Sequence, residues 1–322
     1  MGFEVRRLLA SLLLAAVCSI CGCQAQRARQ PQVLVRPQGL QAKDDFGQTI
    51  SLPHLPQRIV CLAPNVTEIA YALGLGDRIV GVSEFSDYPP AAKQKPLVGR
   101  YDRPSMEKIV SLHPDLVLLG YGNPEELAGA LEKAGIACFG VNPHSIKQVL
   151  TAIERIGEIC GVSEKARQVS DGLLDRAGEV KQKLKDRPMR RPRVFILIDD
   201  AELWTAGRET LQDEIVRLGG GDNIAAFRTS FFQISKESLI AAQPELILVT
   251  GKTREAGRIK AQLMARRELA SLPAVKRHAV EVVEADIFSR PSPRVIDAME
   301  LVYAIVMKHA GDATREGSQA KR

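Results

Sequence analysis

The chain carries one segment twice, at positions far apart in the sequence. Residues 105–118 are SMEKIVSLHPDLVL, and residues 235–248 are SKESLIAAQPELIL. A second pair keeps the same order, with LGLGDRI at residues 73–79 and LGGGDNI at residues 218–224. Solenoid and propeller repeats recur every ~20–50 residues, and this spacing is much longer. The repeat predicts two related lobes, which suggests a cleft between them.

Each copy begins with residues that suit the start of a helix. Ser105 and Ser235 are good N-caps, because a serine oxygen accepts an unpaired backbone N–H of the first turn. Glu107 and Glu237 fall in that turn, where the positive end of the helix dipole favours a carboxylate. The two copies therefore predict equivalent helices, each with an acidic side chain near its start.

Each copy continues as a helix, a proline turn and a strand. The apolar pairs at 109–110 and 239–240 are expected to face inward, and a proline closes each helix. The apolar runs 116–119 and 246–249 predict buried strands. The wider alternation of strands and helices predicts an α/β fold with mostly parallel central sheets covered by helices.

The same patterns divide the chain. The predicted parts are a first lobe at 58–141, a helical connection at 142–192, a second lobe at 193–307 and a frayed polar tail at 308–322. Within the connection, residues 163–185 carry apolar side chains at steps of three and four, which marks one amphipathic helix. At 1.5 Å per residue it would run roughly 35 Å. A helix of this length predicts a stiff spine rather than a hinge.

The N-terminus indicates export. Two arginines precede the apolar stretch 8–17, which is too short to span a bilayer at ~20 residues and is typical of a secretory signal. Residues 20–23, ICGC, resemble the lipobox of bacterial lipoproteins. They predict a signal peptide over 1–22 and lipidation of Cys23, with ordinary signal cleavage as the alternative. Residues 23–57 would hold the start of the mature chain, with a flexible tether over 24–43.

Composition excludes several classes of protein. The net charge of +6 is dispersed, and the dense basic stretch 185–193 lacks aromatic residues, so a solvated linker is favoured over a nucleic-acid site. Cys61, Cys138 and Cys160 are isolated, which predicts neither a disulfide framework nor a zinc site. No catalytic triad is visible, so no catalytic residue and no metal site are predicted.

Three further segments carry a resemblance to a known family. They are RIVCLAPNVTE at 58–68, GVSEFSDYPP at 81–90, and SPRV at 292–295 after Asp286. The chain resembles the helical-spine substrate-binding proteins of ABC importers over about 58–307, and within them the cobalamin-binding members. The resemblance implies two lobes joined by one long α-helix. It also implies a lipid-anchored protein of the periplasm or cell envelope that delivers cobalamin to a permease dimer with ATPase subunits.

The resemblance also implies the residues of the ligand site. In the cobalamin-binding members, aromatic rings from both lobes hold the flat corrin, because aromatic faces bury a large planar ligand at low entropic cost. The matching and adjacent residues here are Phe85, Tyr88, Tyr101, Tyr121, Trp204, Phe231 and Phe232, with Asp286 as a polar cleft residue. Gly120 departs from the pattern, since the relative has a tryptophan there. For Phe231 and Phe232, the alternative to a role in the ligand site is a place in the hydrophobic core.

Several alternatives stay open. Haem is the first, and Tyr101 would then be its axial ligand; a ferric siderophore is the second. A membrane-tethered enzyme using the same cleft is a remote third.

The resemblance further implies that Glu107 and Glu237 grip arginines on the two permease subunits. Helix capping, worth roughly 0.3–1 kcal/mol, is the simpler role for both acids.

Overall fold

The computed structural model describes residues 40–124, 126–199 and 202–319. The predicted signal peptide, the lipidation site Cys23 and most of the predicted tether therefore lie outside the described residues. Among the helices that are described, none is long and apolar enough to cross a membrane.

A short antiparallel hairpin opens the described chain. It consists of β1 (Leu40–Lys43) and β2 (Thr49–Leu52). The turn between its strands is joined to the first lobe, because the backbone N–H of Asp45 donates to the carbonyl of Gly140 at 3.0 Å. The prediction of a flexible tether is therefore wrong for residues 40–43. Alternating burial along β2 explains the difference, since the strand turns two apolar side chains inward.

The first lobe is a four-stranded parallel sheet in the order β4-β3-β5-β6. Its strands are β3 (Ile59–Cys61), β4 (Ile79–Val82), β5 (Leu116–Leu119) and β6 (Cys138–Gly140). Its helices are α2 (Pro64–Ala72), α3 (Met106–Ser111) and α4 (Glu126–Lys133), with 3₁₀ turns η1 (Gly76–Arg78) and η2 (Pro90–Gln94). The central strands β3 and β5 are buried along their whole length, as expected for apolar strands covered on both faces.

The second lobe repeats this plan. Its parallel sheet contains β7 (Arg193–Leu197), β9 (Asp222–Asn223), β11 (Leu246–Gly251) and β12 (Val280–Glu284), and a separate antiparallel pair contains β8 (Trp204–Ala206) and β10 (Phe231–Gln233). Its helices are α7 (Leu211–Leu218), α8 (Lys236–Ala242), α9 (Ala256–Met264), α10 (Pro273–Lys276) and α11 (Ala285–Ser289), with 3₁₀ turns η3 (Thr253–Glu255) and η4 (Arg267–Leu269). Read from its other edge, the sheet order is β9-β7-β11-β12. In both lobes the parallel strands lie in the order second, first, third, fourth, so the sequence repeat is a repeat of topology.

The repeated helices are capped as predicted. The hydroxyl of Ser105 accepts the N–H of Lys108 at 3.3 Å, and that of Ser235 accepts the N–H of Ser238 at 3.1 Å. Their apolar pairs, however, do not both face inward.

In each pair the first side chain is buried, whereas Val110 is 45% exposed and Ile240 is 37% exposed. Consecutive helical residues point about 100° apart, so a short helix that packs on one face cannot bury both. The prediction was wrong for Val110 and Ile240.

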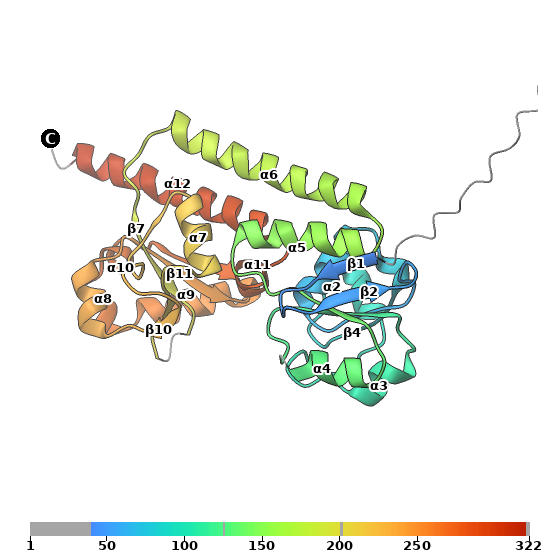
Figure 1. The fold of residues 1–322 in the computed structure, drawn as a ribbon. Coiled ribbons are helices and arrows are strands. Elements are labelled where there is room, and N and C mark those ends of the chain that lie inside the picture. Colours follow the sequence, from blue (N-terminus) through green and yellow to red (C-terminus); the bar gives the residue numbers. More distant parts are fainter. Residues whose placement is uncertain (1–39, 125, 200–201, 320–322) are drawn as a thin grey trace, which may run out of the picture. The chain divides into compact units, whose positions relative to one another are not determined.

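Three helices lie along one side of the two sheets: α5 (Ile146–Ile159), α6 (Ser163–Asp186) and α12 (Val295–Gln319). Figure 1 shows α6 running beside α5 and α12, between the end of the first lobe and the start of β7. This confirms the predicted spine helix. The backbone of α12 is helical to Gln319. The prediction of a frayed tail is therefore wrong for residues 308–319.

A charged cluster fixes the spine helix to α12. The guanidinium of Arg176 on α6 donates to Asp297 and Glu300 on α12, each at 2.6 Å. The hydrogen bonds that Arg176 donates to Glu300 and Asp297 raise its pKa despite its partial burial. The three cysteines in the described part of the chain are buried and unpaired, and burial raises the pKa of Cys138 to about 11.

Candidate ligand-binding site

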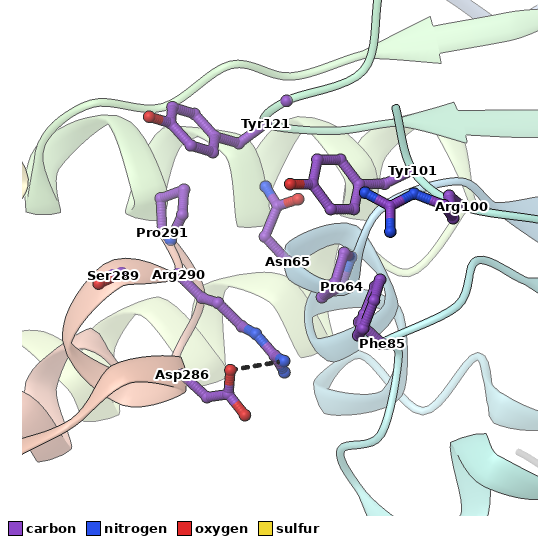
Figure 2. Close-up of a pocket in the computed structure, with 11 residues that line it drawn as sticks. Pro64, Asn65, Phe85, Arg100, Tyr101, Tyr121, Asp286, Ser289, Arg290 and Pro291 are labelled. Carbon is purple, nitrogen blue, oxygen red and sulfur yellow. Dashed lines mark ion pairs between the residues drawn. The ribbon is translucent and has the colours of Figure 1, made fainter. Parts of the chain in front are cut away.

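A pocket of about 420 Å³ lies where the two lobes face each other (Figure 2). From the first lobe it is lined by Pro64, Asn65, Phe85, Arg100, Tyr101, Tyr121 and Gly122. From the second lobe it is lined by Asp286 and Ser289 on α11 and by Arg290 and Pro291, which follow that helix. The volume lies in the range typical of small-molecule sites, ~300–1,000 Å³.

A second hollow of about 360 Å³ continues from the first. The two share Tyr121, Ser289 and Pro291, and the second is also lined by Pro143, His144, Glu209, Thr210, Leu211, Gln212, Thr229, Ser230 and Phe231. Together they form one cleft, with its first part against the first-lobe aromatic residues and its second part against the start of α7. A cleft of this kind suits a ligand larger than either pocket.

Exposed aromatic rings form the first-lobe wall of the cleft. Phe85 is 53% exposed, and its ring centroid lies 6.4 Å from that of Tyr101 in an edge-to-face arrangement. The backbone of Phe85 adopts a φ of 68°, which is unfavourable for a bulky residue and recurs at ligand sites. The guanidinium of Arg100 lies 5.6 Å from the Phe85 ring centroid. These rings present apolar area that a bound ligand would cover.

The buried side chain of Asn123 positions this wall. It accepts the N–H of Gly120 at 2.8 Å and donates to the carbonyls of Leu62 and Tyr101 at 2.9 and 2.6 Å. Gly122 has a φ of 86°, and a Cβ there would lie 3.0 Å from the Tyr101 ring. The turn after β5 therefore depends on both residues to hold Tyr101 in place.

The second-lobe wall is charged, and its charges are paired. Arg290 donates to Asp87 at 2.8 Å and to Glu68 at 3.2 Å, and its other nitrogen pairs with Asp286 at 2.7 Å. Burial raises the pKa of Asp286, against the opposing charge of Arg290. At Asp87, burial acts in the same direction, but the hydrogen bond and charge of Arg290 outweigh it and lower the pKa.

Glu68 connects the two lobes through contacts that include the pocket residue Arg290. It belongs to α2 of the first lobe, is 4% exposed, and accepts hydrogen bonds from three side chains of the second lobe. These are Ser292 Oγ at 2.6 Å, Arg294 Nε at 2.8 Å and Arg290 at 3.2 Å. A buried carboxylate with this many donors is well satisfied, so the lobes are held together at this point.

The structure brings together most, but not all, of the predicted site residues. Phe85, Tyr101, Tyr121 and Asp286 line the first pocket, and Tyr121 and Phe231 line the second. Tyr88 lies at the edge of the Glu68 cluster, with the guanidinium of Arg294 4.0 Å from its ring centroid.

Like Tyr88, two more of the predicted aromatic residues line neither pocket. Trp204 donates its indole N–H to Glu202 at 3.0 Å and lines neither pocket. Phe232 is 5% exposed and belongs to the core of the second lobe. Successive residues of a strand point to opposite faces, so β10 turns Phe231 outward and Phe232 inward. Phe232 therefore takes the core position that was the alternative to a place in the ligand site.

Glu107 and Glu237 lie outside both pockets. A role in docking rather than in ligand binding requires such a position. Each is exposed in the first turn of its helix, α3 or α8. Figure 1 shows these two helices in different lobes, both apart from α6. The exposed Val110 and Ile240 follow one turn later in each helix, so the two lobes present equivalent pairs of an acid and an apolar side chain.

Sequence reasoning missed several residues of the cleft. Asn65 and Gln212 are buried polar residues, and Arg100 and Arg290 are paired cations. Only Arg290 had a local signal, because it lies four residues after Asp286, which is a spacing at which opposite charges pair along a helix. In the described part of the chain, no cluster of three His, Cys, Asp or Glu side chains is placed to hold a metal ion.

The fold and this cleft define a two-lobed binding protein. Residues 59–286 match the family model described as periplasmic binding protein, and the chain belongs to that family. It is 32% identical over 303 residues to the "Uncharacterized ABC transporter substrate-binding lipoprotein YvrC" of Bacillus subtilis, covering 90% of this chain and 93% of the relative. It is 33% identical over 259 residues to a "Vitamin B12-binding protein" of Yersinia pestis, covering 78% and 88%.

Solved structures share the fold. The periplasmic vitamin B12 binding protein BtuF of Vibrio cholerae aligns with a TM-score of 0.69 at 30% identity, covering 79% of this chain and 98% of that one. The periplasmic heme-binding protein RhuT from Roseiflexus aligns with a TM-score of 0.71 at 27% identity, covering 79% and 99%. These matches confirm the predicted fold of two α/β lobes joined by a helical spine.

Proposed function

We propose that this protein is the substrate-binding protein of an ABC importer and that it captures cobalamin in the cleft between its lobes. The aromatic, inter-lobe cleft is the observation that carries the proposal. Relatives named for vitamin B12 binding support it. The relative named as an ABC transporter substrate-binding lipoprotein supports delivery to a permease dimer with its ATPase subunits.

The wall of exposed rings suits a broad ligand. Phe85, Tyr121 and Phe231 are each at least 40% exposed along the cleft. Covering apolar area contributes roughly 25 cal/mol per Å², so a large planar ligand gains free energy against these rings. The charged and polar groups of α11 would orient it.

The charges of the cleft favour a ligand without carboxylates. Arg100 is engaged by both oxygens of Asp102, at 2.8 and 3.0 Å. Arg290 is shared among Glu68, Asp87 and Asp286. Haem would bring two carboxylates into a cleft whose arginines already have partners. Tyr101, which lines the first pocket, is the observation that favours haem, since its phenol oxygen could coordinate iron as an axial ligand.

The proposal includes an anchor and a docking surface. Cys23 would carry the lipid that tethers the mature chain to the membrane, in the periplasm or cell envelope. Glu107 and Glu237 would engage arginines of the two permease subunits. Their exposure at equivalent sites of the two lobes supports this role, since a two-fold permease requires two equivalent contacts.

Calorimetric titration of the mature protein with cyanocobalamin, and separately with haemin, tests the ligand. We expect saturable binding of about one cobalamin per chain and weaker binding of haemin. Haemin binding without cobalamin binding would reject the proposal in favour of the haem alternative. Recovery of chemically altered cobalamin would instead indicate an enzyme.

A further inference from the structure

Two carboxamide side chains, one from each lobe, are buried at the cleft with unpaired polar atoms. Asn65 is 2% exposed, and neither its Nδ2 nor its Oδ1 has a hydrogen-bond partner among the described residues. Gln212 is 4% exposed, and its Oε1 likewise has none. Asn65 lines the first pocket and Gln212 the second.

The two residues occupy equivalent places in the repeated fold. Asn65 lies in the first turn of α2, between the first and second strands of its sheet, and Gln212 lies in the first turn of α7, between β7 and β9. In α2 no side chain caps the first turn, so the positive end of the helix adds to the donor character of this site. The repeat thus presents a buried carboxamide to the cleft from each lobe.

Packing alone gives no reason for these amides. A buried polar group without a partner costs about 1–3 kcal/mol, and leucine has the same branched arrangement of side-chain heavy atoms as asparagine without that cost. The first lobe makes room for Asn65, because a Cβ at Gly120 would lie 2.3 Å from Oδ1. The unpaired atoms therefore call for a partner that arrives with the ligand.

The chemistry of the unpaired atoms selects the ligand group. Asn65 Oδ1 and Gln212 Oε1 need an N–H or O–H donor, and Asn65 Nδ2 needs an acceptor. A carboxamide supplies both, whereas a carboxylate only accepts. We propose that Asn65 and Gln212 are specificity-determining residues that hydrogen-bond carboxamide groups of the ligand.

This inference rests on the proposed function and narrows it. The periphery of a corrin carries carboxamide side chains, whereas a haem carries carboxylates. Figure 2 shows the Asn65 amide pointing toward the side of the pocket where Tyr101 and Tyr121 lie. In the free protein the unpaired atoms of Asn65 are shielded from solvent. The proposal therefore requires these rings to move apart when the ligand binds, so that the ligand group can reach the amide.

Singly hydrolysed cobalamins, in which one carboxamide is a carboxylate, provide the test. We expect wild-type protein to bind cobalamin and to bind at least one of these derivatives about 10-fold or more weakly. In Asn65→Leu or Gln212→Leu, cobalamin affinity falls and the discrimination among the derivatives shrinks. Gln168→Leu, which removes an exposed carboxamide from α6, serves as the matched control. It should leave the cobalamin affinity and the discrimination among the derivatives unchanged.

Thermal unfolding of the ligand-free proteins separates recognition from structure. Removing an unpaired amide should leave the unfolding temperature of Asn65→Leu at or above that of wild type. Discrimination that is the same in wild type and both variants would overturn the assignment, and so would a large loss of stability with unchanged affinity. Failure of wild-type protein to bind cobalamin itself would instead reject the proposed function, and the assignment with it.

Discussion

At the scale of single residues, the exposed rings of the cleft give the most direct prediction. Phe85→Ala should weaken cobalamin binding by about 10-fold or more, because a buried phenylalanine side chain contributes about 1.5–3 kcal/mol. Its stability should change little, since the ring is 53% exposed in the free protein. Phe227→Ala is the matched control, because Phe227 is 68% exposed and lines neither pocket. Isothermal titration of both variants with cobalamin checks this prediction. An equal loss of affinity in Phe85→Ala and Phe227→Ala would argue against a specific aromatic wall.

What the sequence could predict at this scale depended on the kind of residue. Phe85 and Tyr121 reach the cleft because they follow β4 and β5, parallel strands that end at the same edge of one sheet. Tyr101 lies in the long loop before α3 and is tied to the cleft by the hydrogen bond from Asn123 to its carbonyl. Phe232 was misplaced because its strand has only three residues, too few to reveal which face is buried. Asn65 was missed because whether an amide has partners depends on the packing of distant segments.

At the scale of elements, the side of β12 that faces α9 and α12 gives a pH prediction. Burial alone would raise the pKa of Glu281, but hydrogen bonds from Lys260, Lys308 and His309 outweigh it and lower the pKa to about 2. A lowered carboxyl pKa stabilises the fold above the ordinary value of 4.5, and that stability is lost as the pH falls toward 2.

Glu281→Gln should therefore lower the free energy of unfolding at neutral pH and matter progressively less between pH 4.5 and 2. Denaturant unfolding at a series of pH values checks this. The exposed Glu132→Gln provides a control with no expected pH-dependent difference. A stability gap that persists at pH 2 would show that the loss comes from packing.

The repeated helices α3 and α8 give a second prediction at this scale. Losing one of two linked contacts should weaken docking by more than a lone surface ion pair's ~0.2–1 kcal/mol. Glu107→Ala or Glu237→Ala should therefore lower cobalamin uptake by reconstituted vesicles that contain the permease, with ligand affinity near wild type. Glu132→Ala, an exposed acid of the first lobe, is the control. Normal transport by the double variant would leave helix capping as their role.

Elements were the level at which the sequence was most informative. The duplicated segment and the spacing of apolar residues at 163–185 led to the two sheets and to α6, because both patterns are local. The hairpin β1–β2 was missed, because its composition resembles that of the preceding linker and because Gly140, which binds the turn between its strands, lies far along the chain. The C-terminal helix was cut short for a similar reason, since a polar segment carries no packing signal.

At the scale of the whole molecule, the contact between the lobes was beyond sequence reasoning. Glu68 and Arg290 are 222 residues apart, and no local pattern pairs them. The two lobes are joined by the hydrogen bonds to Glu68 and by the spine helix α6.

This arrangement predicts that ligand binding moves the lobes only slightly. Small-angle scattering should show nearly the same radius of gyration for wild-type protein with and without cobalamin, whereas binders hinged on flexible strands close further. Glu68→Ala leaves Arg290 and Arg294 without their shared partner, and breaking a buried ion pair in this way costs about 3–5 kcal/mol. That variant should unfold at a lower temperature and show a larger ligand-induced change in radius of gyration. A large change already in wild type would mean that the Glu68 contact opens during binding, so the lobes would not be rigidly joined.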